Sequence, residues 1–423
     1  MIARGEVVVP GDKSITHRAL MVAALSDGRC VFTSPLAAGD TRTTAAALRT
    51  LGIQVSPLSA ARVAVTGAGM RPFRQPSRPV ACRNSGTTAR LLLGLLAGHA
   101  FEAKLTGDRS LSRRPMARVT EPLRAMGAVV TAAEGERLPM VIRGGALKPL
   151  AWTSPVASAQ VKTCLFLAGL TGGVRVSVTE PVTSRDHSER LLRLLGARVD
   201  VEGTTVTLDP PERLPAFDGE IPGDISSAAY LIAAGVLAES GEVTIRNVGL
   251  NPTRAGFLRA LERMGAKVEV VDRWMSLGEP AGTLVARPAQ LSPVVVEPEE
   301  IPSMVDEVPL LACLASRAEK GWTSVFRGVG ELRVKESDRL ALVASNLSAL
   351  GVAAHVEGDT LMVEGSDAPP RGRVVTAGDH RLAMAFAVLR TVPGAEVELD
   401  DTRCVQISYP HFFRDYGRVV HAA

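Results

Sequence analysis

The sequence has few aromatic residues and few cysteines, and it has no long apolar run. Its 423 residues include 3 Trp, 3 Tyr and 10 Phe, which leaves few side chains for stacking on nucleobases. The five cysteines lie far apart and form no Cys-x-x-Cys pair, a pattern typical of reduced cytosolic thiols. The longest apolar run, LLLGLLAGHAF from Leu91, is shorter than the about 20 residues of a membrane-spanning helix. We therefore expect a cytoplasmic protein that binds neither nucleic acid nor membrane.

Charge of one sign is not in marked excess either. The chain carries 48 Lys and Arg against 44 Asp and Glu, a formal net charge of +4, without a block of like charges. Such a balance does not by itself indicate a polyanionic partner. No basic stretch followed by an apolar stretch marks a signal peptide at the N-terminus. With 46% hydrophobic residues over this length, we expect a globular protein of two or more domains.

Several familiar site motifs are missing as well. Asp12 precedes Lys13, so GDKS is no phosphate-binding P-loop, and GAGMRP from Gly67 lacks the third glycine of a dinucleotide site. No Gly-x-Ser-x-Gly, no His-Glu-x-x-His and no zinc-type Cys and His spacing occurs. We expect chemistry that uses arginines, lysines and carboxylates, with neither a metal nor an organic cofactor.

Six segments of the chain resemble one another. Each begins with small or polar residues, continues as an apolar helix rich in Ala and Leu, and ends at Gly. They start at intervals of about 65 to 80 residues, a period that fits a repeated supersecondary unit. The segments are GDKSITHRAL from Gly11, RNSGTTARLLLGLLAG from Arg83, SAQVKTCLFLAGLTGG from Ser158, PGDISSAAYLIAAGVLAESG from Pro222, SMVDEVPLLACLASRAEKG from Ser303 and AGDHRLAMAFAVLRTVPG from Ala377.

A second set of five segments falls between them. Each has apolar residues at helical spacing, a glycine at the helix end and a Val-rich strand afterwards. They begin near residues 41, 115, 188, 253 and 338. Each repeat therefore predicts strand, helix, strand, helix and one or two further strands. Six such units, three in each half, predict a two-lobed α/β protein whose helices pack against sheets.

The polar starts of the apolar helices predict anion sites, because a helix N-terminus offers unpaired N–H groups and partial positive charge. Ser14 and Arg18 share a helix face, with Lys13 at the preceding turn. In RNSGTTAR, Asn84 or Ser85 is placed to cap the helix. Plain helix caps and surface arginines are the alternative interpretation of each segment alone.

Three further segments carry cations at similar places. In the segment just named, Gly86 lets a ligand approach the backbone. In the first of the further segments, GDRSLSRRP, Arg114 precedes a proline at an expected helix start. Lys335 and Arg339 are four residues apart with Glu336 between them. This pattern fits either a salt-bridged surface helix or a cationic clamp with a carboxylate for proton transfer. GDHR, which ends at Arg381, begins another repeat helix.

These motifs resemble the 5-enolpyruvylshikimate-3-phosphate (EPSP) synthase family over almost the whole chain. The motifs shared in order are PGDKSITHRAL, RNSGTTARLL, TGDRSLSRRPM, SAQVKTCLFLAGL, SRDHSERLL, VDEVPLLA, RVKESDRL and GDHRLAMAF. The resemblance implies transfer of the enolpyruvyl group of phosphoenolpyruvate to the 5-hydroxyl of shikimate 3-phosphate, with release of phosphate. It also implies a monomer folded as a two-lobed inside-out α/β barrel of six βαβαββ units.

The resemblance places the substrates between two lobes that close around them. The N-terminal lobe is expected to be residues 13–222, and the C-terminal lobe residues 1–12 and 223–423. Hinges are expected at the two crossovers, near residues 12–13 and 222–223.

The resemblance also implies a role for individual residues. Phosphoenolpyruvate binding is implied for Lys13, Gly86, Arg114, Gln160, Arg339 and Arg381. Shikimate 3-phosphate binding is implied for Lys13, Ser14, Arg18, Ser158, Ala159, Gln160, Ser184, Arg185, Asp306 and Lys335. The expected acid at the methylene carbon is Glu336, and the expected base at the hydroxyl is Asp306. Lys13 and Lys335 are expected to stabilise developing negative charge.

The chain departs from the enterobacterial pattern of the family. Ala159 replaces a serine, His187 a tyrosine and Glu331 an asparagine, and a C-terminal lysine is missing near Ile407. Together with SRDHSERLL, these differences resemble the second branch of the family, in which Arg185 compensates at the phosphate. Gly86 leaves room for glyphosate, a ligand of this site in the family.

Two alternatives stay open from the sequence. A sister family transfers enolpyruvate to UDP-N-acetylglucosamine and carries a loop cysteine in a Gly-Cys-x-Ile-Gly setting, which none of the five cysteines here occupies. A non-catalytic polyanion-binding protein would use the same arginines, although Asp306 and Glu336 favour an enzyme.

Overall fold

The computed structural model describes residues 1–422, which form two compact units. The N-terminal unit comprises Gly11–Ile221 and the short segment Met275–Glu279. The C-terminal unit comprises Met1–Pro10, Pro222–Trp274 and the chain from Pro280 onward. Within residues 1–422, each unit contains three β-sheets and its own hydrophobic core, which makes the chain a two-domain α/β protein.

The N-terminal unit is built from short helices and strands that alternate along the chain. Its helices are α1 (Lys13–Ala24), α2 (Gly39–Thr50), α3 (Gly86–Ala97), α4 (Ala117–Ala125), α5 (Ala159–Gly172) and α6 (His187–Leu194). Its strands are β2 (Ser26–Thr33), β3 (Gln54–Val55), β4 (Arg62–Ala68), β5 (Val80–Ala81), β6 (Glu102–Thr106), β7 (Val129–Ala133), β8 (Arg137–Arg143), β9 (Leu150–Thr153), β10 (Val176–Thr179), β11 (Arg198–Glu202), β12 (Thr205–Asp209), β13 (Leu214–Pro215) and β14 (Gly219–Glu220).

The C-terminal unit follows the same alternation. Its helices are α7 (Ile225–Leu237), α8 (Gly256–Arg263), α9 (Val308–Ala315), α10 (Arg339–Ala349), α11 (His380–Val388) and α12 (Phe412–Val419). Its strands are β1 (Ile2–Val8), β15 (Ser240–Gly249), β16 (Glu269–Ser276), β17 (Glu279–Ala286), β18 (Val295–Val296), β19 (Thr323–Phe326), β20 (Ala354–Glu357), β21 (Thr360–Glu364), β22 (Arg371–Val374), β23 (Glu396–Leu399) and β24 (Val420–His421). The turn that joins β16 to β17 is grouped with the N-terminal unit.

One supersecondary unit explains the sheets. The unit consists, in chain order, of β5, α3, β6, α4, β7 and β8. Its four strands form a sheet in the order β5-β6-β8-β7. β5 and β6 are parallel, whereas β8 is antiparallel to both β6 and β7. The strands β9 to β12 and β18 to β21 repeat this arrangement. The predicted two-domain α/β fold is confirmed, and it is assembled from six small sheets within residues 1–422.

One helix was missed by the sequence pattern. α12 (FFRDYGRV) is the sixth helix of the second set within the described residues, after α2, α4, α6, α8 and α10. Its glycine, Gly417, lies inside the helix rather than after it. The expected stop signal is therefore absent, and the segment does not resemble the other five.

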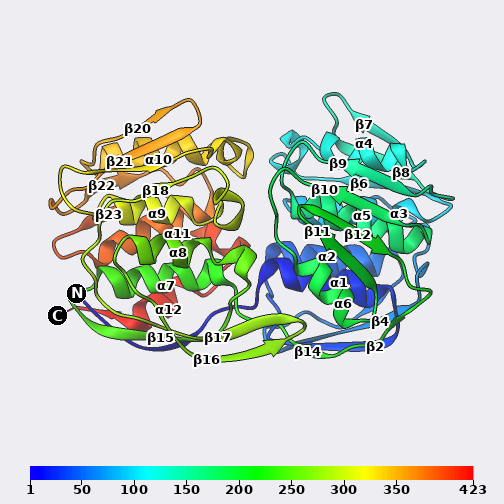
Figure 1. The fold of residues 1–423 in the computed structure, drawn as a ribbon, viewed down its shortest axis with the longest axis horizontal. Coiled ribbons are helices and arrows are strands. Elements are labelled where there is room, and N and C mark those ends of the chain that lie inside the picture. Colours follow the sequence, from blue (N-terminus) through cyan, green and yellow to red (C-terminus); the bar gives the residue numbers. More distant parts are fainter. Residues whose placement is uncertain (423) are drawn as a thin grey trace. The chain divides into compact units, whose positions relative to one another are not determined.

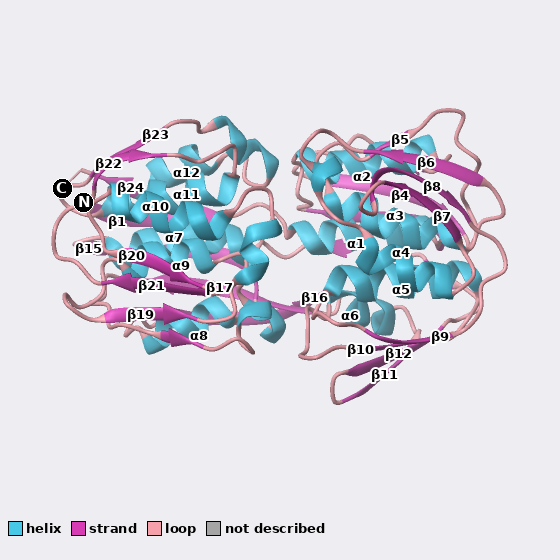
Figure 2. Cartoon of the chain, turned by 90° about the horizontal axis from the view of Figure 1, so that it is seen from above, coloured by secondary structure: helices cyan, strands magenta, loops and turns pink. Residues whose placement is uncertain are grey.

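In each unit the helices lie between the sheets, as Figures 1 and 2 show. α3 and α5 illustrate why some of these helices are apolar nearly all round. Buried residues of both helices run from their first turns to their last, since each contacts neighbours on several sides. A Cβ at Gly94 of α3 would lie 2.1 Å from the carbonyl oxygen of Cys164 in α5, so this close packing requires glycine.

The five cysteines are free and buried. Burial raises the pKa of Cys82 to about 12 and, as the leading cause, also that of Cys164 to about 12, so both thiols stay protonated and unreactive near neutral pH. Among residues 1–422, no helix has both the length and the apolar character needed to cross a membrane.

Candidate active site

Four helices of the N-terminal unit begin with the residues that the sequence singled out. α1 begins at Lys13, α3 at Gly86, α5 at Ala159 and α6 at His187. Side chains cap the first three of these helices: Asp12 accepts the N–H of Ile15, Ser85 that of Thr88, and Ser158 that of Val161. The structure thereby decides between the two proposed caps of α3, because Ser85 and not Asn84 accepts the bond. Such caps satisfy part of each first turn and leave other N–H groups available to a ligand.

Arg18 ties three of these helix starts together. Its Nε donates to Ser188 Oγ of α6 at 2.8 Å, and its Nη2 donates to Thr163 Oγ1 of α5 at 2.8 Å. Nη1 donates to the carbonyl of Ser14 in α1 at 3.0 Å. Burial is the main reason that the pKa of Arg18 falls to about 10, so the guanidinium remains charged at neutral pH. The structure brings Ser14, Arg18 and Ala159 together, since Arg18 Nη2 also lies 3.3 Å from the Ala159 carbonyl.

A second arginine links α3 to α5. Arg90 Nη1 donates to Gln160 Oε1 at 2.8 Å, and Gln160 Nε2 donates to Thr87 Oγ1 at 2.9 Å. A Cβ on Gly86 would lie 3.0 Å from Arg90 Nη1 and 3.5 Å from Arg114 Nη1. Gly86, Gln160 and Arg114 therefore lie close together around Arg90. Arg90, the last residue of RNSGTTAR, was assigned no role from the sequence, although its bond to Gln160 completes this group.

Arg114 and Lys13 are each held by a polar neighbour. Arg114 Nη2 donates to Asn84 Oδ1 at 2.6 Å. Lys13 Nζ lies 3.4 Å from Asp40 Oδ2, with 17% of the lysine side chain exposed. Both side chains are only partly buried, so an incoming anion can reach them.

Ser158 and Ser184 meet at one carboxylate. Glu180, which follows β10, accepts the backbone N–H of Ser158 at 2.7 Å and the hydroxyl of Ser184 at 2.8 Å. Lys162 Nζ lies 3.0 Å from the same carboxylate. Arg185 follows Ser184 directly in the chain. Sequence reasoning missed Glu180 and Lys162, although a lysine inside the apolar run QVKTCLFLAGL signals a buried cation that needs a partner.

The C-terminal unit gathers its own set of charges around Arg339. Arg339 Nε donates to Asp379 Oδ2 at 2.7 Å, and Nη2 donates to Glu336 Oε2. Nη1 lies 3.6 Å from Asp306 Oδ1. The arginine side chain is 1% exposed. Although burial lowers the pKa of Arg339, Asp379 and Glu336 offset that effect and raise it, so the group is permanently charged.

Arg381, in α11, lies close to Asp306 as well. Its Nη2 lies 3.6 Å from Asp306 Oδ2, and its Nη1 lies 3.8 Å from Glu307 Oε1. The structure therefore brings Asp306, Glu336, Arg339 and Arg381 together, four residues that the sequence named from three separate motifs.

Lys335, also named from the sequence, forms its hydrogen bond with a glutamate outside this group of four residues. Its Nζ donates to Glu331 Oε1 at 2.8 Å. This pair is partly exposed and four residues apart, as in the surface-helix interpretation, but Lys335 immediately precedes Glu336 in the chain.

The sequence did not pair carboxylates with the two arginines, although GDHR placed Asp379 at a helix start as a cap. Asp379 caps α11 through the N–H of Arg381 and also accepts the hydroxyl of Ser337. Burial raises the pKa of Asp379, but Arg339 and His380 together lower it by more, so its pKa falls below the ordinary range. Glu307 accepts bonds from Ser226 and Arg254. Asp379 thus orients Arg339 through hydrogen bonds, and Glu307 lies 3.8 Å from Arg381. An oriented guanidinium favours recognition of a planar anion.

Together these groups can bind small anions and move protons. Each unit presents arginines oriented by hydrogen bonds. In the C-terminal unit, the carboxylates of Asp306 and Glu336 lie beside Arg339 and Arg381. Within residues 1–422, no group of three or more His, Cys, Asp or Glu side chains is arranged to hold a metal ion.

Comparison with known proteins gives a consistent result. The family model described as "EPSP synthase (3-phosphoshikimate 1-carboxyvinyltransferase)" matches residues 3–416. The chain is 48% identical to 3-phosphoshikimate 1-carboxyvinyltransferase of Thermus thermophilus, over 99% of this chain and 97% of the relative. It is 44% identical to the enzyme of the same name from Geobacillus kaustophilus, over 97% of this chain and 96% of the relative.

Solved structures agree with the sequence matches. The structure of EPSP synthase from Acinetobacter baumannii superposes with a TM-score of 0.88 at 35% identity, covering 99% of this chain and 96% of that one. The enolpyruvyl transferase NikO of Streptomyces tendae, at 19% identity and a TM-score of 0.76, shares the fold. The chain therefore belongs to the EPSP synthase (3-phosphoshikimate 1-carboxyvinyltransferase) family.

Proposed function

We propose that this protein transfers the enolpyruvyl group of phosphoenolpyruvate to the 5-hydroxyl of shikimate 3-phosphate, a step of the shikimate pathway. The observation that carries this proposal is the cluster in which buried Arg339 and Arg381 lie beside the partly exposed carboxylates Asp306 and Glu336, in a chain that matches the family model from residue 3 to residue 416. Arg339 and Arg381 suit an anionic substrate, and the carboxylates of Asp306 and Glu336 suit proton transfer.

The reaction balances as an addition followed by an elimination. The substrate hydroxyl loses its proton and forms a C–O bond to C2 of phosphoenolpyruvate, while C3 gains a proton. The resulting tetrahedral intermediate then loses the C3 proton and the phosphate, which restores the double bond. We assign Glu336 as the acid at C3 and Asp306 as the base at the hydroxyl, with Lys13 and Lys335 stabilising developing negative charge.

For phosphoenolpyruvate, the carboxylate is assigned to Arg339 and Arg381. A guanidinium offers the two parallel N–H groups that a carboxylate accepts. The phosphate is assigned to a group of residues in the N-terminal unit: Lys13, Gly86, Arg114 and Gln160. The absence of a side chain at Gly86 matters here because a methyl group would lie only 3.0 Å from the Nη1 atom of Arg90 and would contact that of Arg114 at 3.5 Å.

For shikimate 3-phosphate, the ring carboxylate is assigned to Ser14 and Arg18. The 3-phosphate is assigned to Ser158, Ser184 and Arg185, with the start of α5, Ala159 and Gln160, beside them. These residues support the assignment because Arg18 and Glu180 connect the starts of α1, α5 and α6 through hydrogen bonds.

We further propose that the protein belongs to the second branch of the family and acts as a cytoplasmic monomer. Ser158-Ala159-Gln160 and SRDHSERLL support the branch. The interior helices and outer sheets of each unit support an inside-out barrel.

Phosphate release tests the proposed function. Inorganic phosphate is measured with both substrates present and with each one alone. Phosphate that appears only with the pair supports the transfer. Equal release from phosphoenolpyruvate alone would identify a phosphatase, and release with UDP-N-acetylglucosamine in place of shikimate 3-phosphate would identify the sister transferase.

A further inference from the structure

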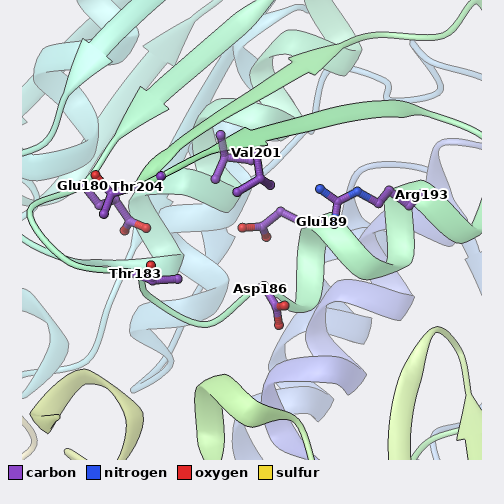
Figure 3. A pocket seen from close by; sticks show the side chains of 9 residues that line it. Glu180, Thr183, Asp186, Glu189, Arg193, Val201 and Thr204 are labelled. Carbon is purple, nitrogen blue, oxygen red and sulfur yellow. The ribbon is translucent and has the colours of Figure 1, made fainter.

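A lysine is buried between two glutamates in the N-terminal unit. Lys162 Nζ of α5 lies 3.0 Å from Glu180 Oε2 and 2.6 Å from Glu189 Oε1 of α6. The side chains are 1%, 1% and 2% exposed for Lys162, Glu180 and Glu189. Both glutamates line a cavity of about 230 Å³, and Figure 3 shows their carboxylates pointing toward one another. We call Lys162, Glu180 and Glu189 the buried charge triad.

The two glutamates differ in their other partners. Glu180 Oε1 accepts the backbone N–H of Ser158 at 2.7 Å. Its Oε2 accepts the backbone N–H of Ser184 at 3.3 Å and the hydroxyl of the same serine at 2.8 Å. Glu189 Oε1 pairs with Lys162, whereas both serines bond to Glu180. One carboxylate thus connects the N-cap of α5 to the loop before α6.

The positive charge of Lys162 allows the Glu180 carboxylate to lie near a bound anion. An uncompensated carboxylate beside a phosphate would repel it strongly in a site of low dielectric constant. Burial lowers the pKa of Lys162, but Glu189 and Glu180 raise it by more, so the ammonium stays charged and balances Glu180. A buried ion group costs desolvation energy that apolar residues would avoid, and stability alone therefore does not account for it.

We propose that Glu180 is a positioning residue for the 3-phosphate of the shikimate substrate, because its carboxylate holds the backbones of Ser158 and Ser184. This inference rests on the proposed function. The Ser158 hydroxyl accepts the N–H of Val161 and keeps its own proton for an anion. The Ser184 hydroxyl donates to Glu180 without ligand, and rotation about its Cβ–Oγ bond turns that proton to the phosphate. The backbone bonds to Glu180 persist throughout.

The test compares two matched variants. Glu180→Gln and Glu189→Gln each remove one buried negative charge and leave Lys162 paired with the other glutamate. Only Glu180→Gln weakens the bonds to Ser158 and Ser184. We expect Glu180→Gln to raise the KM and Kd of shikimate 3-phosphate about tenfold, since charge-assisted hydrogen bonds are lost. The KM of phosphoenolpyruvate is expected to stay within twofold, and Glu189→Gln to leave both constants within twofold.

Two further measurements separate positioning from a general loss of structure. The affinity for shikimate, which lacks the phosphate, is expected to be the same in Glu180→Gln and the unchanged protein. Glu180→Asp keeps the charge beside Lys162 but is one methylene shorter, and it is expected to weaken shikimate 3-phosphate in the same selective way. It therefore tests the inference if Glu180→Gln does not fold.

The outcomes are distinct. Selective loss of shikimate 3-phosphate affinity in the Glu180 variants alone supports the inference. Equal losses in Glu180→Gln and Glu189→Gln, or equal losses for shikimate and its 3-phosphate, overturn it. If the unchanged protein binds shikimate 3-phosphate but releases no phosphate from the pair, the proposed function fails, while the binding comparison still decides the role of Glu180.

Discussion

Replacing Asp379 by Asn tests the buried charge group of the C-terminal unit. Asp379 is 1% exposed and accepts bonds from Arg339 Nε at 2.7 Å and Nη2 at 3.2 Å. Asn caps a helix about as well as Asp, so the cap of α11 is kept and the charge is lost. Breaking a buried pair from one side costs about 3 to 5 kcal/mol. Arg339 retains Glu336 as a partner, so we expect the lower end, about 3 kcal/mol.

The matched control is Asp338→Asn. Asp338 caps α10 through the N–H of Ala341 in an exposed setting, and its side chain lies 3.8 Å from exposed Arg333. Exposed pairs contribute about 0 to 1 kcal/mol, so the control is expected to lose less than about 1 kcal/mol. Urea denaturation followed by circular dichroism gives both values, and hydrogen exchange in α11 reports the C-terminal unit separately.

The pH dependence has a definite sign. The pKa of Asp379 is depressed in the folded protein, because Arg339 and His380 together outweigh the effect of burial. Its charge therefore stabilises the fold above the ordinary carboxyl pKa, and this stabilisation is lost as the pH falls through the depressed value. The difference between Asp379→Asn and the unchanged protein is expected to shrink in that acid range. Equal stability losses for Asp379→Asn and Asp338→Asn at neutral pH would refute the reasoning.

Three further predictions concern other parts of the molecule. Glu336→Gln is expected to lower kcat by about 10²- to 10⁴-fold with little change in substrate Kd; stopped-assay rates and binding titrations check this, and an unchanged kcat would remove Glu336 from the chemistry. Gly94→Ala is expected to destabilise the N-terminal unit by about 1 to 3 kcal/mol or more, because its Cβ would lie 2.1 Å from the Cys164 carbonyl; thermal unfolding measures it, and an unchanged Tm would contradict the packing. His99 accepts the N–H of Phe73, and burial is the main cause that lowers its pKa to about 4. It therefore favours the folded state above the ordinary histidine pKa, and this contribution is lost as the pH falls from 6.5 toward 4. His99→Gln is expected to flatten that part of the profile of stability against pH. An unaltered profile would show that His99 does not cause the loss of stability in that range.

The repeats could be read from the sequence because their signals are local. Apolar residues at helical spacing, polar first turns and terminal glycines lie within a few residues of one another, as in α3 (Gly86–Ala97), which begins after its Ser85 cap and ends before Gly98. The same signals indicated where cations stand relative to helix starts. α12 escaped detection because Gly417 lies within the helix, so the local signal differed from that of the other repeats.

The candidate site was predictable in part for the same reason. Arg18, Arg339 and Arg381 each stand in a helix's first or second turn, a position that spacing alone reveals. The family resemblance supplied their expected substrates, which no periodicity encodes. The partners of these residues were not predictable, because Asp379 is 40 positions from Arg339 and Ser188 is 170 positions from Arg18.

The sequence alone determined the repeat plan, the apolar helices and the placement of cations at helix starts, because each depends on contacts between near neighbours in the chain. Only the tertiary structure decided which carboxylate faces which cation. Lys162 shows the difference: its charge inside an apolar helix required some buried partner, but folding selected Glu180 and Glu189, 18 and 27 positions away, and so placed Glu180 against Ser158 and Ser184.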